Sequence, residues 1–189
     1  MTQCALRTGG PCGAAHLAPR PQAVHLPEMV RGVPHAVITT AMSAAIGANR
    51  ARVWRAITDP AEMIRWDEQR LALLEPVENY PQVGQHVSWR YRLGTVSIVL
   101  HDRPTEVVPQ ERLRSRVDLG LFRFDQTWSL VSEISKGEIE RTRLGLHLSA
   151  HNSIDVVGGT VDRFGVRQIA VEYVDGRLRS LQKWCESHS

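Results

Sequence analysis

Alternating apolar and polar residues dominate the middle of this chain and predict a run of β-strands. Residues 86–93 have the period of two that a half-buried strand shows, because successive side chains point to opposite faces. One face carries Val87, Trp89, Tyr91 and Leu93, and the other carries His86, Ser88, Arg90 and Arg92. Further strands are expected at 71–78, 95–109, 112–119, 121–134 and 139–151.

Short turns separate these strands, at Gly94 and at the SKGE tetrapeptide that starts at Ser135. Turns of this length join neighbouring antiparallel strands as hairpins. The six strands therefore predict an antiparallel sheet with one apolar face and one arginine-rich face.

Two short helices are expected before this meander. A β-branched segment at 36–47 predicts a first strand, and Asn49 then suits the N-cap of a helix that runs through Ile57. Asp59 is the expected cap of a second helix, with Pro60 at its first position. Glu62 lies three residues after this cap, at the spacing of a capping box.

The chain ends in a long helical pattern over 161–186. Its apolar residues recur at helical spacing, as one stripe that can cover the apolar face of the sheet: Phe164, Val171, Val174, Leu178, Leu181 and Cys185. The predicted class is α+β, with two short helices after the first of about seven strands and an antiparallel sheet whose apolar face the C-terminal helix can cover. Residues 1–35 are rich in proline and glycine and predict a disordered leader, so the expected domain is 36–189.

Composition excludes several function classes. The chain has 23 basic and 20 acidic residues, and its arginines are scattered, so no basic run predicts nucleic-acid binding. No segment has the 18 consecutive apolar residues of a membrane span. The three cysteines form no CxxC pair, which indicates neither a zinc site nor a disulfide framework and suits the cytoplasm. His147 and His151 lie too far apart in a strand to share an ion, so neither metal nor cofactor is expected.

Polar residues on the predicted inner face are the candidates for chemistry. Ser115, Gln126, Glu140 and Thr142 share the parity of apolar neighbours. They are either hydrogen-bonded members of a filled core or polar groups of a ligand pocket, and Glu140 alternatively lies at the wet end of the sheet. Burial of Glu140 would raise its pKa and suit a general base.

Several motifs together resemble one superfamily. The segment VWRAITDPAEMIRW at 53–66, the loop YPQVGQHV at 80–87 and the terminus LRSLQKWCE at 178–186 are similar to the START-like SRPBCC superfamily, which has the helix-grip fold. The resemblance implies a curved sheet wrapped around the long C-terminal helix, with a cavity for a small apolar molecule between them. Its members include polyketide cyclases and dehydratases, lipid carriers, hormone receptors and a co-chaperone group. The co-chaperone group often has an aromatic residue where this chain has Asp67.

Three functions follow from this resemblance: binding of a lipid- or polyketide-like ligand, cyclisation or dehydration of a poly-β-keto substrate, and a co-chaperone-type interaction, by a monomer or a homodimer. The expected catalytic residues are Glu140 as base, Gln126, and Tyr91, which would polarise a carbonyl. The expected ligand-binding residues are Trp66, Trp89, Tyr91, Ile98, Phe122, Phe124, Trp128, Leu144, Leu146, Phe164, Val171 and Val174.

Overall fold

A computed structural model describes residues 37–120, 122–133, 140–151 and 163–188. The predicted leader, the SKGE turn and the 152–162 segment lie outside these residues. The elements follow in the order β1 (Val37–Ile46), α1 (Arg50–Thr58), α2 (Pro60–Trp66), β2 (Arg70–Leu73), β3 (Val87–Leu93), β4 (Val96–Val108), β5 (Arg112–Leu119), β6 (Phe122–Glu133), β7 (Arg141–His151) and α3 (Arg163–Ser187).

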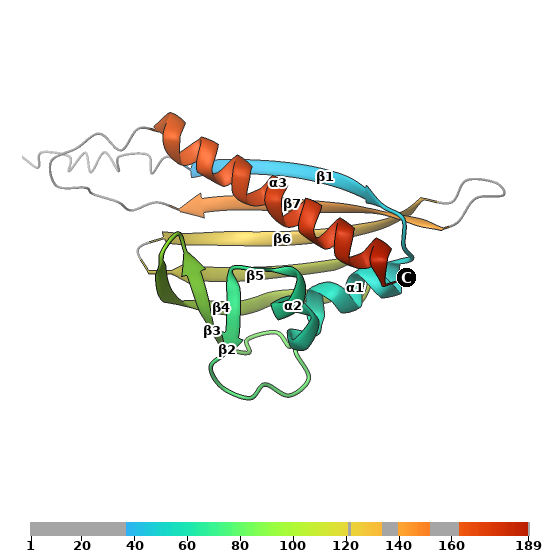
Figure 1. Ribbon diagram of the computed structural model, residues 1–189, viewed down its shortest axis with the longest axis horizontal. Coiled ribbons are helices and arrows are strands. Elements are labelled where there is room, and N and C mark those ends of the chain that lie inside the picture. The colour runs from blue at the N-terminus through green and yellow to red at the C-terminus, as the bar shows by residue number, and fades with distance from the viewer. Residues whose placement is uncertain (1–36, 121, 134–139, 152–162, 189) are drawn as a thin grey trace, which may run out of the picture. The chain divides into compact units, whose positions relative to one another are not determined.

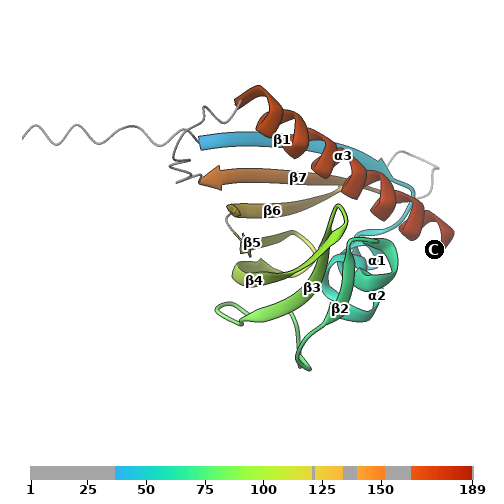
Figure 2. The same cartoon turned by 60° about the vertical axis from the view of Figure 1, so that its left-hand side comes forward.

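The strands form one seven-stranded antiparallel sheet in the order β1-β7-β6-β5-β4-β3-β2. The α3 helix crosses one face of this sheet above β1 and β7, and α1 and α2 lie near its C-terminal end (Figure 1). The sheet twists strongly, so that β2 and β3 stand steeply to β1 and β7 (Figure 2). These features confirm the predicted α+β helix-grip class.

The caps of the short helices are confirmed. Asn49 Oδ1 accepts the backbone N–H of Arg52 at 2.8 Å, and Asp59 Oδ1 accepts that of Ala61 at 2.8 Å. The predicted capping box is wrong. The backbone N–H of Asp59 donates to the carbonyl of Arg55 at 2.8 Å and not to the Glu62 side chain. Glu62 is engaged by side chains of α1 and α3 instead.

The apolar face of the sheet is buried against the helices. In β5, for example, Leu113, Val117 and Leu119 are buried, and the intervening arginines are exposed. One core cluster centres on α1, α3, β6 and β7, and a second on α2, β3 and β4. Phe124 and Tyr173 pack against both clusters, so the boundary between them lies beneath the middle of α3.

The hairpin between β3 and β4 departs from the expected burial. Gly94 has a φ of 60° in the turn, a conformation that glycine adopts readily. Leu93 and Val96, which pair across this turn, are 44% and 58% exposed although their parity is that of the buried face. Because the hairpin extends past the core, parity at its tip does not determine burial.

Candidate functional site

A group of buried charges lies between α3 and the connection from α2 to β2. Asp67 follows α2 directly, Arg70 begins β2, and Arg177 comes from the middle of α3. Asp67 Oδ2 lies 3.1 Å from Arg177 Nη1 and 3.5 Å from Arg70 Nε. Each of the three residues is at most 5% exposed. Charges so deeply buried persist in a fold only when they are paired.

Aromatic rings enclose the two guanidinium groups. The carbon centre of Arg177 lies 5.2 Å from the ring centroid of Trp66, 5.7 Å from that of Trp128 and 5.2 Å from that of Tyr173. Arg70 lies over the ring of Trp89 at 4.3 Å. A cation over an aromatic face is attracted by the ring quadrupole, and more so without water.

Two tyrosines extend this group. Arg177 Nη1 donates a hydrogen bond to the Tyr173 hydroxyl at 2.6 Å, and the Tyr91 hydroxyl donates to Gln69 Oε1. Burial raises the pKa of Tyr91 far above its usual range, and nearby Tyr173 adds to the shift, so this phenol stays neutral. Burial alone would lower the pKa of Arg177, but the neighbouring Asp67 outweighs it and the net shift is upward.

A second polar group lies near Arg70. The Tyr80 hydroxyl donates a hydrogen bond to Asp102 Oδ2 at 2.9 Å and interacts with Ser115. Burial, followed by the charge of Asp102, raises the pKa of Tyr80 well above its usual range. The inner face of the sheet is therefore polar as well as aromatic.

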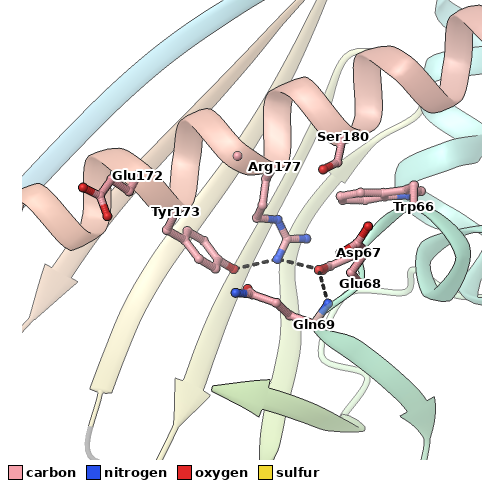
Figure 3. Close-up of a pocket in the computed structure, with 9 residues that line it drawn as sticks. Trp66, Asp67, Glu68, Gln69, Glu172, Tyr173, Arg177 and Ser180 are labelled. Atoms are coloured by element: carbon pink, nitrogen blue, oxygen red, sulfur yellow. Dashed lines mark hydrogen bonds and ion pairs between the residues drawn. The ribbon is translucent and has the colours of Figure 1, made fainter. Parts of the chain in front are cut away.

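A small pocket opens beside these charges, with a volume of about 200 Å³. Ligand pockets in proteins commonly measure about 300–1,000 Å³, so this one suits a compact molecule. Its deeper residues are Trp66, Asp67, Tyr173 and Arg177, and its rim is exposed (Figure 3). The rim consists of Glu68, Gln69, Glu172, Gly176 and Ser180.

Among the predicted ligand-binding residues, Trp66 lines this pocket. Trp66 and Trp128 meet edge to face at 6.5 Å, and Phe124 meets Tyr173 at 6.2 Å. The others with described side chains pack in the two core clusters or beside them: Trp89, Tyr91, Ile98, Leu144, Leu146 and Val174, with Val171 half-buried on α3. The side chains of Phe122 and Phe164 lie outside the described residues.

The expected catalytic residues do not converge on the pocket. Gln126 and Tyr91 are buried on the inner face, whereas Glu140 is exposed just before β7. The Glu140 carboxylate accepts a hydrogen bond from Ser132 at 3.2 Å. Glu140 is therefore exposed, and its position fits the expected alternative at the wet end of the sheet.

Sequence reasoning missed Asp67, Arg70 and Arg177 as site residues. A signal existed for Arg177, because it falls three residues after Val174 and four before Leu181, inside the apolar stripe of α3. Charged residues are almost never fully buried without a partner, so a charge in that stripe predicts a buried counter-charge. In the structure, Asp67, which follows Trp66, is this counter-charge.

Within the described residues, no group of three or more metal-ligating side chains could hold an ion. No helix in those same ranges combines the length and apolarity that crossing a membrane requires.

The antiparallel sheet, the two short helices and the long C-terminal helix define a helix-grip protein. The chain belongs to the polyketide cyclase/dehydrase and lipid transport family, whose profile matches residues 37–186.

Solved structures share the fold at low sequence identity. A START superfamily protein from Mycobacterium smegmatis is 13% identical, with 80% of this chain and 99% of that chain covered and a TM-score of 0.64. TTHA0849 from Thermus thermophilus is 21% identical, with 80% and 99% covered and a TM-score of 0.61. DynU16, described as a putative protein in the dynemicin biosynthetic locus, is 20% identical, with 77% and 47% covered and a TM-score of 0.50. No curated protein matches the chain.

Proposed function

We propose that this domain binds a small, largely apolar organic molecule in the pocket between α3 and the connection from α2 to β2. The observation that supports this function best is the pocket of about 200 Å³ beside α3, where Trp66 and Tyr173 provide aromatic surface and Arg177 provides a polar contact. Small-molecule sites are usually concave and largely apolar, and here Trp66 and Tyr173 supply the apolar surface while the rim is polar. The family description, which names polyketide and lipid chemistry, agrees with such a ligand.

Gly176 allows a sharp test. It lines the pocket, and a Cβ added there would meet no atom within 4 Å. In Gly176→Trp the new side chain is expected to fill the pocket without displacing the core. Lys183→Trp is the matched control, because Lys183 is an exposed residue of the same helix away from the pocket.

Native mass spectrometry of protein purified from its own cells is the readout. We expect a bound small molecule on the wild-type protein and on Lys183→Trp, and none on Gly176→Trp. Equal occupancy of the three proteins, or no bound molecule on any of them, would contradict ligand binding at this site.

A second candidate is catalysis of cyclisation or dehydration of a poly-β-keto chain. Its support is the neutral Tyr91 phenol, which donates to Gln69 at the pocket rim and is thus a proton donor close to the site. Tyr91→Phe is expected to slow turnover of such a substrate by about a hundredfold, a typical loss when one hydrogen-bond donor to a developing oxyanion is removed. Glu140→Gln serves as the control that leaves turnover unchanged, since Glu140 is exposed.

A further inference from the structure

The guanidinium of Arg177 reaches the inner part of the pocket with one edge unused. Its Nη1 atom serves both Asp67, at 3.1 Å, and the Tyr173 hydroxyl, at 2.6 Å. Its Nε and Nη2 atoms are buried and have no hydrogen-bond partner among the residues that the structure describes. A buried N–H group without an acceptor costs free energy, so such groups usually have a partner or a function.

The geometry of these two donors points to a particular ligand group. In the planar guanidinium, Nε–H and one N–H of Nη2 point the same way and form a fork. This fork matches the two oxygens of a carboxylate, which accepts two parallel hydrogen bonds from it. A ligand with a single carbonyl or hydroxyl oxygen cannot form the same pair of parallel hydrogen bonds with these two donors.

The charges around the fork also favour an anion. Arg70 and Arg177 share one carboxylate, that of Asp67, within their ion pairs. The other buried carboxylate nearby, Asp102, accepts the hydrogen bond of Tyr80. Glu68 and Glu172 stand at the rim, but both are exposed, and solvent and salt screen exposed charges.

We propose that the pocket binds a small hydrophobic carboxylic acid in its ionised form. The carboxylate accepts the Nε–H and Nη2–H bonds of Arg177, and the apolar part lies against Trp66 and Tyr173. Because both nitrogens are covered by protein atoms, the carboxylate displaces neighbouring side chains as it enters. Asp67 holds the guanidinium from its other side and so fixes the orientation of the fork. This inference rests on the proposed ligand-binding function and specifies its ligand class.

Two probes of the same shape test this inference: benzoate, which is anionic, and benzamide, which is neutral. Isothermal titration on the full chain is expected to show at least tenfold tighter binding of benzoate, because a charge-assisted pair of hydrogen bonds adds more than about 1.4 kcal/mol, the equivalent of tenfold. In Arg177→Lys the charge and the pairing with Asp67 remain, but the fork is lost. The preference for benzoate is expected to fall severalfold in this variant.

The variant Arg177→Gln removes the guanidinium fork and leaves Asp67 in its ion pair with Arg70 at 3.5 Å, so no buried charge of this group loses its last partner. Its preference for benzoate is expected to vanish. Glu111→Gln is the control and should retain the wild-type preference, because this exposed carboxylate does not line the pocket.

Equal binding of benzoate and benzamide by the wild type would overturn the inference while leaving ligand binding intact. Binding of neither probe would overturn both proposals. A preference that survives in Arg177→Gln would show that another group recognises the anion, and would overturn the assignment to Arg177.

Discussion

The indole N–H of Trp184, near the end of α3, donates a hydrogen bond of 2.9 Å to Glu62 Oε2 in α2. The same carboxylate pairs with Arg52 at 2.7 Å and with Arg55 at 2.8 Å, both from α1. One acidic side chain thus joins all three helices at one end of the domain.

Acid is expected to weaken this junction. Burial raises the pKa of Glu62, but hydrogen bonds from Trp184 and Arg52 and the charges of Arg52 and Arg55 outweigh it, so the pKa lies below its ordinary value of 4.5. A carboxyl whose pKa is lower in the folded state contributes stability above its unfolded pKa, and that contribution is lost as pH falls through the folded pKa.

Glu62→Gln should therefore lower the urea midpoint at pH 7 and flatten its decline below about pH 4.5. The comparison variant is Glu106→Gln, whose ion pair with Arg112 is exposed and should matter little. Identical pH profiles for wild type and Glu62→Gln would contradict this role.

Removing one partner of the Asp67–Arg177 pair is expected to be costly. Asp67→Ala leaves two buried guanidinium groups without a carboxylate and should reduce the free energy of unfolding by about 3–5 kcal/mol. Asp67→Ala/Arg177→Leu should recover part of the loss, because it removes one of the unpaired charges. Urea titrations of the wild type, the single variant and the double variant measure these free energies of unfolding. A double variant no more stable than the single one would count against the pairing.

Thr142 supplies a buried hydrogen bond from the sheet to the loop before α1. Its hydroxyl donates to the carbonyl of Ala48 at 2.7 Å, and the residue is fully buried. Thr142→Val keeps the shape but leaves the carbonyl unpaired, so we expect a loss of about 1–3 kcal/mol. Thr142→Ser retains the hydroxyl and isolates the effect of the lost methyl group. If Ser and Val cost the same in thermal unfolding, the hydrogen bond is not the stabilising element.

Cys185 should react slowly with thiol reagents in the folded protein. Burial raises the pKa of its thiol to about 11, so little reactive thiolate forms at about pH 8. In a Cys4→Ser/Cys12→Ser background, labelling is expected to be slow in buffer and fast in denaturing urea. Rapid labelling without urea would show that the last turns of α3 open readily.

The elements of this fold could be predicted because each carries a local signal. The alternation in β3 and β5, the caps at Asn49 and Asp59, and the apolar stripe of α3 all follow from residues near one another in sequence. Where burial depends on distant parts of the chain, prediction was weaker. Leu93 shares the parity of Tyr91, but it lies beyond the reach of the helices that cover the core.

The charged part of the site could not be found by pattern alone. Asp67 and Arg177 lie 110 residues apart in the sequence. Only the packing of α3 in the folded domain brings them together. Reasoning from apolar periodicity predicted ligand contacts at Leu144, Leu146 and Val174, which the structure places in the first core cluster. Polar residues within an apolar stripe were the more informative signal.

The pairing of β1 with β7 bears on the order in which the domain assembles during synthesis. β1 is an edge strand whose neighbour in the sheet is β7. Val37 pairs with His151, so the backbone of β1 forms its sheet hydrogen bonds only when β7 is present. Such distant pairing has a high loop-closure cost and slows folding. On the ribosome, β1 emerges first and the meander from β2 to β6 follows, but β1 joins the sheet only after β7 has emerged.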